Sequence, residues 1–329
     1  TKPVKMERLK ETIARLQLAE QIEQKNFIAA EATCYQLIQT KPKDAPLWFT
    51  LSQIFLQLNK PEQAVKSLLN AAKFDNKAAV EALSTAVKLS FNHNLTTAGF
   101  EASQALLKIK PDAETYFLDS CFANCLNLSH RSEISSGKAL ELAPDKMSYQ
   151  IEHAKALCNR GKITEALSYY QNAIELEPKD DEAYFRKLFS SNYCEHLEEE
   201  PIFQEHQSNG LRLEKLHPKV EDFPVRDKSA RIRLGYVSKD FRNHSVAFFF
   251  IGMIKNHDPS LFEVFCYSDC PSYLKDDMTE KLKSHSEHWV DSSQLSDEQL
   301  YRQIRNDKID ILIDLIGLTI FPRMAVYAK

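Results

Sequence analysis

NRGKITEALSYYQNAIELEP, residues 159–178, contains the residues that decide the fold of the amino-terminal half of this chain. Gly161 lies where a turn is expected, and Pro178 marks the end of the segment, because proline cannot continue a helix. One face of the helix between them carries Ala166, Tyr170 and Ala173. Small side chains on that face allow a second helix to approach closely. The stretch therefore predicts the second helix of a tightly packed helical pair.

The same pattern recurs along the first 180 residues with a period of about 34. The end of each unit is marked by Pro42, Asn76, Pro111, Pro144 and Pro178. Small residues stand twelve positions before each mark: Ala30, Ala64, Gly99, Ser132 and Ala166. Small or apolar residues stand five positions before each mark: Leu37, Ala71, Leu106, Ala139 and Ala173. The second unit adds Trp48, Leu51, Ser52 and Phe55. This arrangement resembles the tetratricopeptide unit, a helix–turn–helix that is stable only when neighbours stack on it.

We therefore predict an all-α tetratricopeptide solenoid of about five repeats over residues 1–180, followed by a capping helix and linker over 181–230. The repeats are placed near 11–44, 45–78, 79–112, 113–146 and 147–180. Such solenoids are usually protein-binding scaffolds. Protein or peptide partners are expected on the concave face, which the first helix of each unit lines.

A different pattern begins at Arg231. Short β-branched or aromatic runs alternate with segments of helical spacing, which predicts a parallel sheet wrapped by helices, a Rossmann-like α/β lobe over 231–329. The expected strands are 231–237, 262–268, 288–291 and 309–315, and the expected helices are 246–257, 273–285 and 296–307. Ligands of open parallel sheets bind at the loops that leave the carboxyl ends of the strands. Those loops are SKDFRNHS (238–245), SDCPSYLKDD (268–277) and IGLTIFPR (316–323).

The segments RIRLGYVSKDFRNHSVAFFF (231–250), HDPSLFEVFCYSD (257–269) and IRNDKIDILIDLIGLT (304–319) resemble the protein O-GlcNAc transferase and Spindly-like family, glycosyltransferase family 41. The resemblance implies the first half of a GT-B type glycosyltransferase. Such an enzyme moves GlcNAc from UDP-GlcNAc, or fucose from GDP-fucose, to Ser or Thr of proteins without a catalytic metal. The donor lobe would follow position 329. We therefore expect this chain to be a piece of a longer gene product, and we expect the piece alone to bind no cofactor and to be inactive.

In the same family, concave-face asparagines hold peptide backbone. The equivalent residues here are Leu16, Thr50, Thr85, Leu118 and Glu152, so this ladder is absent. The alternative function is a non-catalytic tetratricopeptide scaffold that carries a degenerate transferase lobe.

The candidate catalytic residue is His244, which matches the family's cleft histidine in the loop after the first strand. Its role would be acceptor positioning or proton handling; the alternative is that it only caps the helix that begins near Val246. The candidate substrate-binding residues are Asp240, Arg242, Asn243, Gly317 and Thr319. We interpret Asp314 as a hydrogen-bonded structural carboxylate, because an unpaired buried charge is costly. Many relatives have histidine at the position of Leu318.

Composition excludes several classes of function. Lys and Arg total 42 against 46 Asp and Glu, a net charge of −4, so no overall positive field attracts nucleic acid or anionic lipid. No apolar run reaches the ~20 residues of a membrane helix. The seven cysteines favour reduced thiols and a cytoplasmic location over a disulfide framework. Their two Cys-x3-Cys pairs lack zinc spacing, so no metal is expected.

Overall fold

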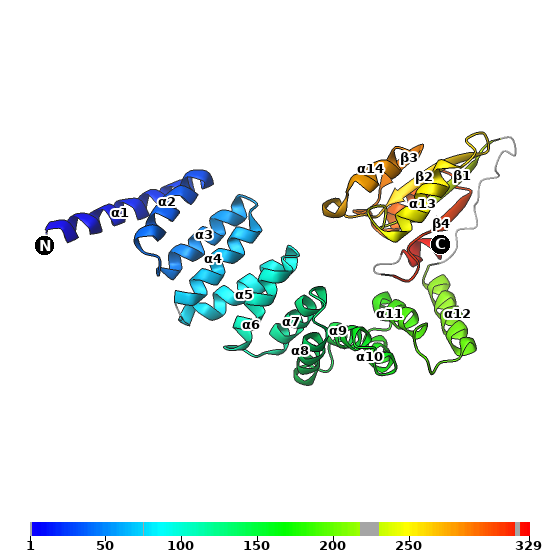
Figure 1. Ribbon diagram of the computed structural model, residues 1–329, viewed down its shortest axis with the longest axis horizontal. Helices are drawn as coiled ribbons and strands as arrows, with labels where there is room; N and C mark the ends of the chain where they lie inside the picture. Colours follow the sequence, from blue (N-terminus) through cyan, green and yellow to red (C-terminus); the bar gives the residue numbers. More distant parts are fainter. Residues whose placement is uncertain (1, 75, 218–229, 320–322) are drawn as a thin grey trace. The chain divides into compact units, whose positions relative to one another are not determined.

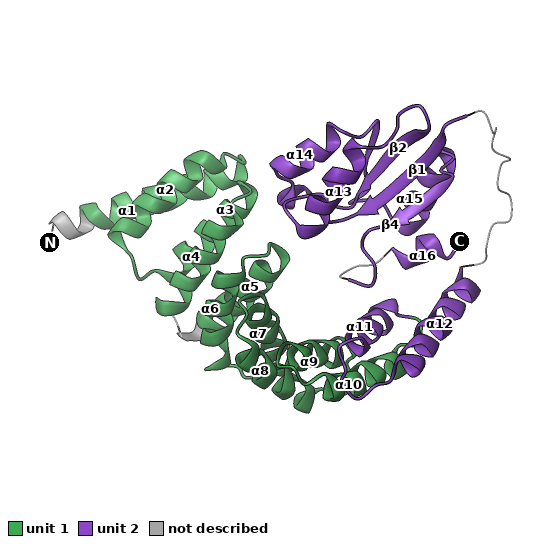
Figure 2. Ribbon diagram, turned by 45° about the vertical axis from the view of Figure 1, so that its right-hand side comes forward, with its two compact units in different colours: residues 1–179 green, residues 180–329 purple. Residues whose placement is uncertain are grey.

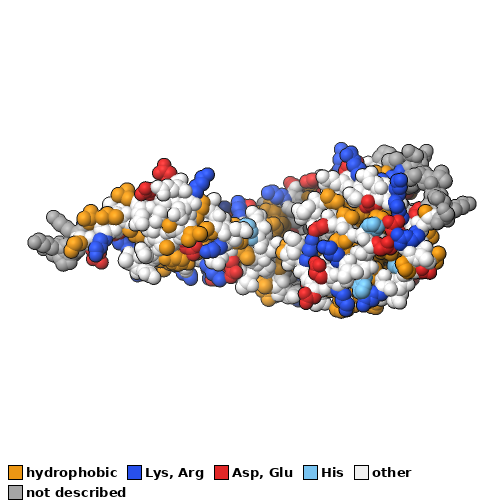
Figure 3. All heavy atoms as spheres, turned by 90° about the horizontal axis from the view of Figure 1, so that it is seen from above, with side chains coloured by type: hydrophobic (Ala, Val, Ile, Leu, Met, Phe, Trp, Pro, Cys, Tyr) orange, Lys and Arg blue, Asp and Glu red, His pale blue; other side chains and the backbone are white. Residues whose placement is uncertain are grey.

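The computed structural model describes residues 2–74, 76–217, 230–319 and 323–329. It divides into two compact units, Thr1–Lys179 and Asp180–Lys329, which are coloured separately in Figure 2. On the face shown in Figure 3, acidic and basic side chains lie interspersed. No helix in the described part of the chain is long and apolar enough to cross a membrane.

The first unit is a succession of helices in which each packs against the next, which confirms the predicted all-α solenoid (Figure 1). Its helices are α1 (Lys2–Glu23), α2 (Phe27–Thr40), α3 (Ala45–Gln57), α4 (Pro61–Phe74), α5 (Asn76–Asn92), α6 (Thr96–Leu107), α7 (Ala113–Cys125), α8 (Ser129–Leu142), α9 (Met147–Asn159) and α10 (Ile163–Leu176). The small residues twelve positions before each repeat end are all buried. At Gly99 the approach is so close that an added Cβ would lie 2.3 Å from the ring of Phe122.

The turn inside each helical pair uses a residue with positive φ. These residues are Lys25, Asn59, Asn94, Asn127 and Gly161, with φ between 56° and 75°. Asparagine and glycine reach this left-handed region at low cost, which is why they predominate here. Sequence reasoning placed a turn at Gly161 and missed the other four.

Two carboxylates are buried in the middle of the solenoid. Asp119 on α7 is fully buried and accepts hydrogen bonds from Ser103 and Gln104 on α6 and from Arg131 and Ser135 on α8. Because buried charges require partners, these polar contacts replace apolar packing between three successive helices.

Glu152 on α9 is the second buried carboxylate, with 3 % of its surface exposed. It accepts hydrogen bonds from Ser120 and Asn124 on α7 and from Lys155 on its own helix. Leu118 is also buried, at 7 % exposure. Leu118 and Glu152, two of the positions equivalent to the family's asparagine ladder, therefore belong to the packing between helices.

The second unit begins with α11 (Asp181–Ser191) and α12 (Glu199–Leu216), which pack against each other. Ion pairs join Lys187 to Glu205 and Arg212 to Asp181, and the Arg212 guanidinium also stacks 3.8 Å from the ring centroid of Tyr184. The extended linker that the sequence predicts falls largely on 218–229, outside the described residues.

A four-stranded parallel sheet follows, in the order β3-β2-β1-β4. Its strands are β1 (Ile232–Ser238), β2 (Phe262–Ser268), β3 (His288–Asp291) and β4 (Ile311–Asp314), close to the predicted runs. Helices α13 (Ser245–Lys255) and α14 (Asp277–Lys283) cover one face, while α15 (Asp297–Asn306) and α16 (Met324–Tyr327) cover the other. The predicted helix over 273–285 is interrupted. A 3-10 turn at Ser272–Leu274 comes first, and α14 begins at Asp277, with Asp276 as its N-cap residue.

The strand register brings the predicted loops to one edge of the sheet. Ser238 pairs with Ser268, and Ser268 pairs with Asp291. Val237 pairs with Asp314 on the other side. All four strands therefore end together, and the residues that follow them form the candidate site.

Candidate active site

The loop after β1 is held in place by a buried aromatic side chain. Phe241 is fully buried and stacks on Phe250 of α13, with ring centroids 5.1 Å apart. Asp240, just before it, is 6 % exposed and accepts a hydrogen bond from the Arg242 guanidinium at 3.3 Å. This anchoring fixes the backbone that leads to His244.

His244 is the N-cap residue of α13. Its Nδ1 accepts a hydrogen bond from the backbone N–H of Val246 at 3.3 Å and lies 3.7 Å from Oδ2 of Asp240. Since an accepting Nδ1 carries no proton, the neutral ring holds its proton on Nε2. The side chain is 36 % exposed. In this arrangement His244 offers a ligand an N–H donor, while its other nitrogen caps the helix.

Asp276 joins the first loop to the second, and sequence reasoning missed it. Its Oδ2 accepts the backbone N–H of Asn243 at 2.7 Å, and its Oδ1 accepts the N–H groups of Met278 and Thr279 at the start of α14. The hydrogen bond from Asn243, with those from Thr279 and Met278, lowers the pKa of Asp276 against a smaller opposing effect of burial. The available signal was an Asp followed three residues later by Thr, the spacing of a capping box.

The chain after β4 turns sharply around Asp314. Its carboxylate accepts the N–H groups of Ile316 at 2.8 Å and Gly317 at 3.0 Å, and the hydroxyl of Tyr327 at 3.2 Å. These bonds support the interpretation of Asp314 as a structural carboxylate. Gly317 has φ +61° and is exposed, and the hydroxyl of Thr319 donates to the carbonyl of Ile316. The Gly317 amide and the Thr319 hydroxyl are thus engaged in forming the turn itself.

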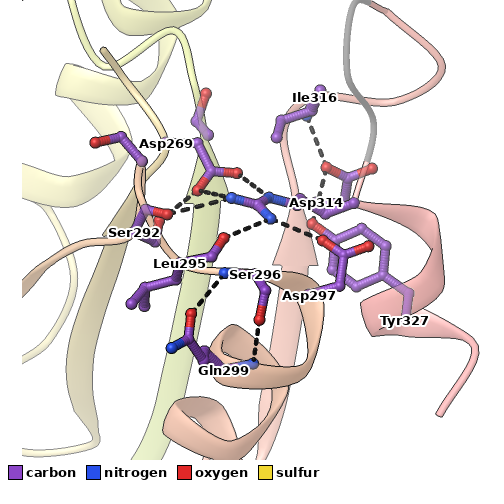
Figure 4. Close-up of polar contacts among 12 residues, drawn as sticks. Asp269, Ser292, Leu295, Ser296, Asp297, Gln299, Asp314, Ile316 and Tyr327 are labelled. Carbon is purple, nitrogen blue, oxygen red and sulfur yellow. Dashed lines mark hydrogen bonds and ion pairs between the residues drawn. The ribbon is translucent and has the colours of Figure 1, made fainter. Parts of the chain in front are cut away.

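An arginine side chain connects the residues that follow β2 and β3 at the same edge; its partners Asp269, Ser292, Leu295 and Asp297 are labelled in Figure 4. Arg323 forms an ion pair with both carboxylate oxygens of Asp269, at 2.8 and 3.1 Å, and with Asp297 at 2.7 Å. It also donates to the carbonyls of Leu295 at 3.0 Å and Ser292 at 3.2 Å. Burial lowers the pKa of Arg323, but the hydrogen bonds to Asp269 and Asp297 outweigh that effect, so its pKa is raised.

Sequence reasoning did not single out Arg323. Its partners lie 26 to 54 residues earlier in the chain, and only the parallel topology brings them together. Among the described residues, no group of three His, Cys, Asp or Glu side chains has the arrangement of a metal site.

Two family models match the chain. Residues 195–329 match glycosyl transferase family 41, and residues 21–87 match the tetratricopeptide repeat. These matches confirm the resemblance drawn from the sequence: residues that match the tetratricopeptide repeat precede a segment that matches the family 41 model. The family 41 match begins upstream of β1 and includes α12.

Similar proteins include the probable UDP-N-acetylglucosamine–peptide N-acetylglucosaminyltransferase SPINDLY of Arabidopsis thaliana, 29% identical over 151 residues. That alignment covers 44% of this chain and 16% of the relative. SEC of Arabidopsis thaliana, a protein of the same description, is 37% identical over 101 residues, covering 30% of this chain and 10% of SEC. The chain thus aligns with a small part of these relatives.

A solved structure of an O-GlcNAc transferase mutant from Thermobaculum terrenum is similar in fold. Its TM-score is 0.66 at 26% sequence identity, and the match covers 77% of this chain and 48% of that one.

Proposed function

We propose that the gene product containing this chain is a protein O-glycosyltransferase that moves N-acetylglucosamine from UDP-N-acetylglucosamine to Ser or Thr of protein substrates. The observation that carries the proposal is the family 41 match over the lobe whose carboxyl edge presents His244. Fucose from GDP-fucose is the other donor to be tested. The repeats would recruit the protein substrate, and the seven cysteines, which form no disulfide in the structure, favour the reducing cytoplasm.

His244 would contribute to this reaction through its Nε2–H group. Because Nδ1 is engaged with the Val246 amide, the ring is fixed in orientation before a substrate arrives. A fixed N–H donor can hold an acceptor hydroxyl or a sugar oxygen in place. To accept a proton on Nδ1, the ring would first have to give up the cap.

Two substitutions of His244 separate substrate contact from capping. His244→Asn retains a side-chain oxygen that caps α13 but removes Nε2, whereas His244→Ala removes both functions. We expect both variants of the complete gene product to lose about 10²-fold or more in turnover, as for removal of a preorganised donor or positioned acid–base group. Only His244→Ala should lose about 1 kcal/mol of folding stability, the usual value of an N-cap.

The assay is transfer from each nucleotide sugar to a Ser-containing peptide, followed by mass spectrometry, with the Ser→Ala peptide as control. Melting temperature and nucleotide affinity are measured on the same samples. Full turnover by His244→Asn would show that His244 is only a cap. Absence of transfer from both donors by folded wild-type protein that still binds peptide would favour the scaffold alternative.

A further inference from the structure

We propose that Arg323 is a positioning residue: through Tyr327 and Asp314, it holds the turn at Gly317 in the conformation that the structure shows. The inference rests on the proposed function, because it assigns this turn to the substrate-binding edge. Arg323 itself is mostly shielded from solvent and acts only through other residues.

The first observation is that the guanidinium is fully satisfied. An arginine has five N–H donors in one plane, and Arg323 makes five hydrogen bonds, with its side chain only 16 % exposed. Its bond to Asp269 is bidentate, a geometry that lysine cannot reproduce. A side chain with every donor engaged in protein contacts has none left for a ligand, which argues for positioning rather than binding.

The second observation is where the partners lie. Asp269 directly follows β2, Ser292 directly follows β3, and Asp297 is the first residue of α15. One side chain therefore connects the chain after β4 with the ends of two other strands. Asp269 is itself held by the hydroxyl of Ser292, at 2.5 Å.

The third observation is the path from Arg323 to the exposed turn. Arg323 directly precedes α16, whose last residue, Tyr327, donates its hydroxyl to Asp314. Asp314 in turn accepts the amides of Ile316 and Gly317. If Arg323 is removed, α16 keeps its apolar packing through Val326 and Tyr327 but loses its hydrogen bonds to the loops after β2 and β3. Tyr327 can then move relative to Asp314. The turn then loosens although no residue in it has changed.

The experiment compares Arg323→Ala with Arg231→Ala in the complete gene product. Arg231 is a matched control because it also bonds a carboxylate, that of Glu287, and two carbonyls, those of Pro259 and Phe262, but at the amino end of the sheet. The readouts are hydrogen exchange of the Ile316 and Gly317 amides, the acceptor KM and kcat, and the melting temperature.

We expect Arg323→Ala to raise exchange at the turn about tenfold or more, and to lower kcat/KM by 10- to 10²-fold, as small misplacements in active sites do. Millimolar guanidinium should restore part of both effects. Arg231→Ala should lower the melting temperature without either effect. Equal changes in both variants, or unchanged exchange at the turn, would overturn the proposal.

Tyr327→Phe keeps the test possible if Arg323→Ala does not fold. It removes one hydroxyl, leaves every Arg323 contact in place, and should also raise exchange at Gly317; unchanged exchange there contradicts the proposed path. Because hydrogen exchange needs no activity, failure of the proposed function appears separately, as a wild-type protein with an ordered turn and no sugar transfer.

Discussion

Replacing Asp119 by alanine should destabilise the solenoid by about 3 kcal/mol, a value obtained by following three of its four donors, Ser103, Arg131 and Ser135. Ser103 keeps a second acceptor, the carbonyl of Phe100 at 2.9 Å. Arg131 has a side chain that is 35% exposed and can be rehydrated. Ser135 is fully buried and loses the carboxylate that accepts its hydrogen bond. A buried hydroxyl without an acceptor costs about 1–3 kcal/mol of folding free energy. Loss of the charge-assisted bond from Arg131 costs about the same amount, part of which is recovered when water hydrates the Arg131 guanidinium.

The matched control is Asp112→Ala on the same helix. Asp112 caps α7 by accepting the Thr115 amide at 2.9 Å, and its loss should cost only about 1 kcal/mol. Urea unfolding of residues 1–329 is followed by helix circular dichroism. In a Trp48→Phe background, fluorescence of Trp289 reports the lobe as an internal standard, because the chain has two tryptophans. If Asp119→Ala is no less stable than Asp112→Ala, the buried network contributes nothing beyond a surface cap and the reasoning fails.

Gly99→Ala should lower the stability of the fold by about 1–3 kcal/mol, because the added Cβ would overlap the ring of Phe122. At Gly137 the nearest atom to an added Cβ lies 3.5 Å away, in the ring of His153, so Gly137→Ala should be neutral or stabilising. The urea unfolding midpoints of the two variants test this. Burial lowers the pKa of His153, so the folded chain binds this proton more weakly than the unfolded chain. Stability should therefore be full above the unfolded pKa of about 6.5 and fall as the pH drops below it. His153→Gln should reduce that slope; a slope equal to that of the wild-type chain would contradict the assignment.

The repeat architecture could be predicted because its determinants are local. Close helix packing requires small side chains at fixed intervals, and Ala30, Ala64 and Ala166 are fully buried as expected. The strands could be predicted equally well from the sequence, since buried parallel strands form short apolar runs. Asp119 carried no such signal: a lone Asp in a helical pattern usually faces solvent, and its partners belong to two other helices.

The candidate site was predicted by position rather than by contact. The rule that ligands bind at the carboxyl ends of parallel strands located Asp240, His244 and Gly317 at one edge. It could not show that the Nδ1 atom of His244 is engaged with a backbone amide, because capping geometry depends on dihedral angles. The role of Arg323 could not be predicted for another reason. Its contacts join three loops that are distant in sequence, and the spacing of residues within one motif does not show which loops lie together.

The order of strands in the sheet has a consequence for how the chain matures on the ribosome. In the solenoid each helix contacts its neighbours in sequence, so every repeat can fold as soon as the next one emerges. The sheet cannot, because β1 pairs with β4, and the bond from the Arg233 amide to Asp310 spans 77 residues. Until β4 is synthesised, one edge of β1 stays open, and an unpaired strand edge is a template for pairing with another chain. The nascent protein therefore passes through a stage in which a finished array of repeats carries an unfinished, association-prone lobe. Pairing of β4 with β1 covers that edge, and the later ion pair of Arg323 with Asp269, 54 residues earlier, then links the chain after β4 to the end of β2.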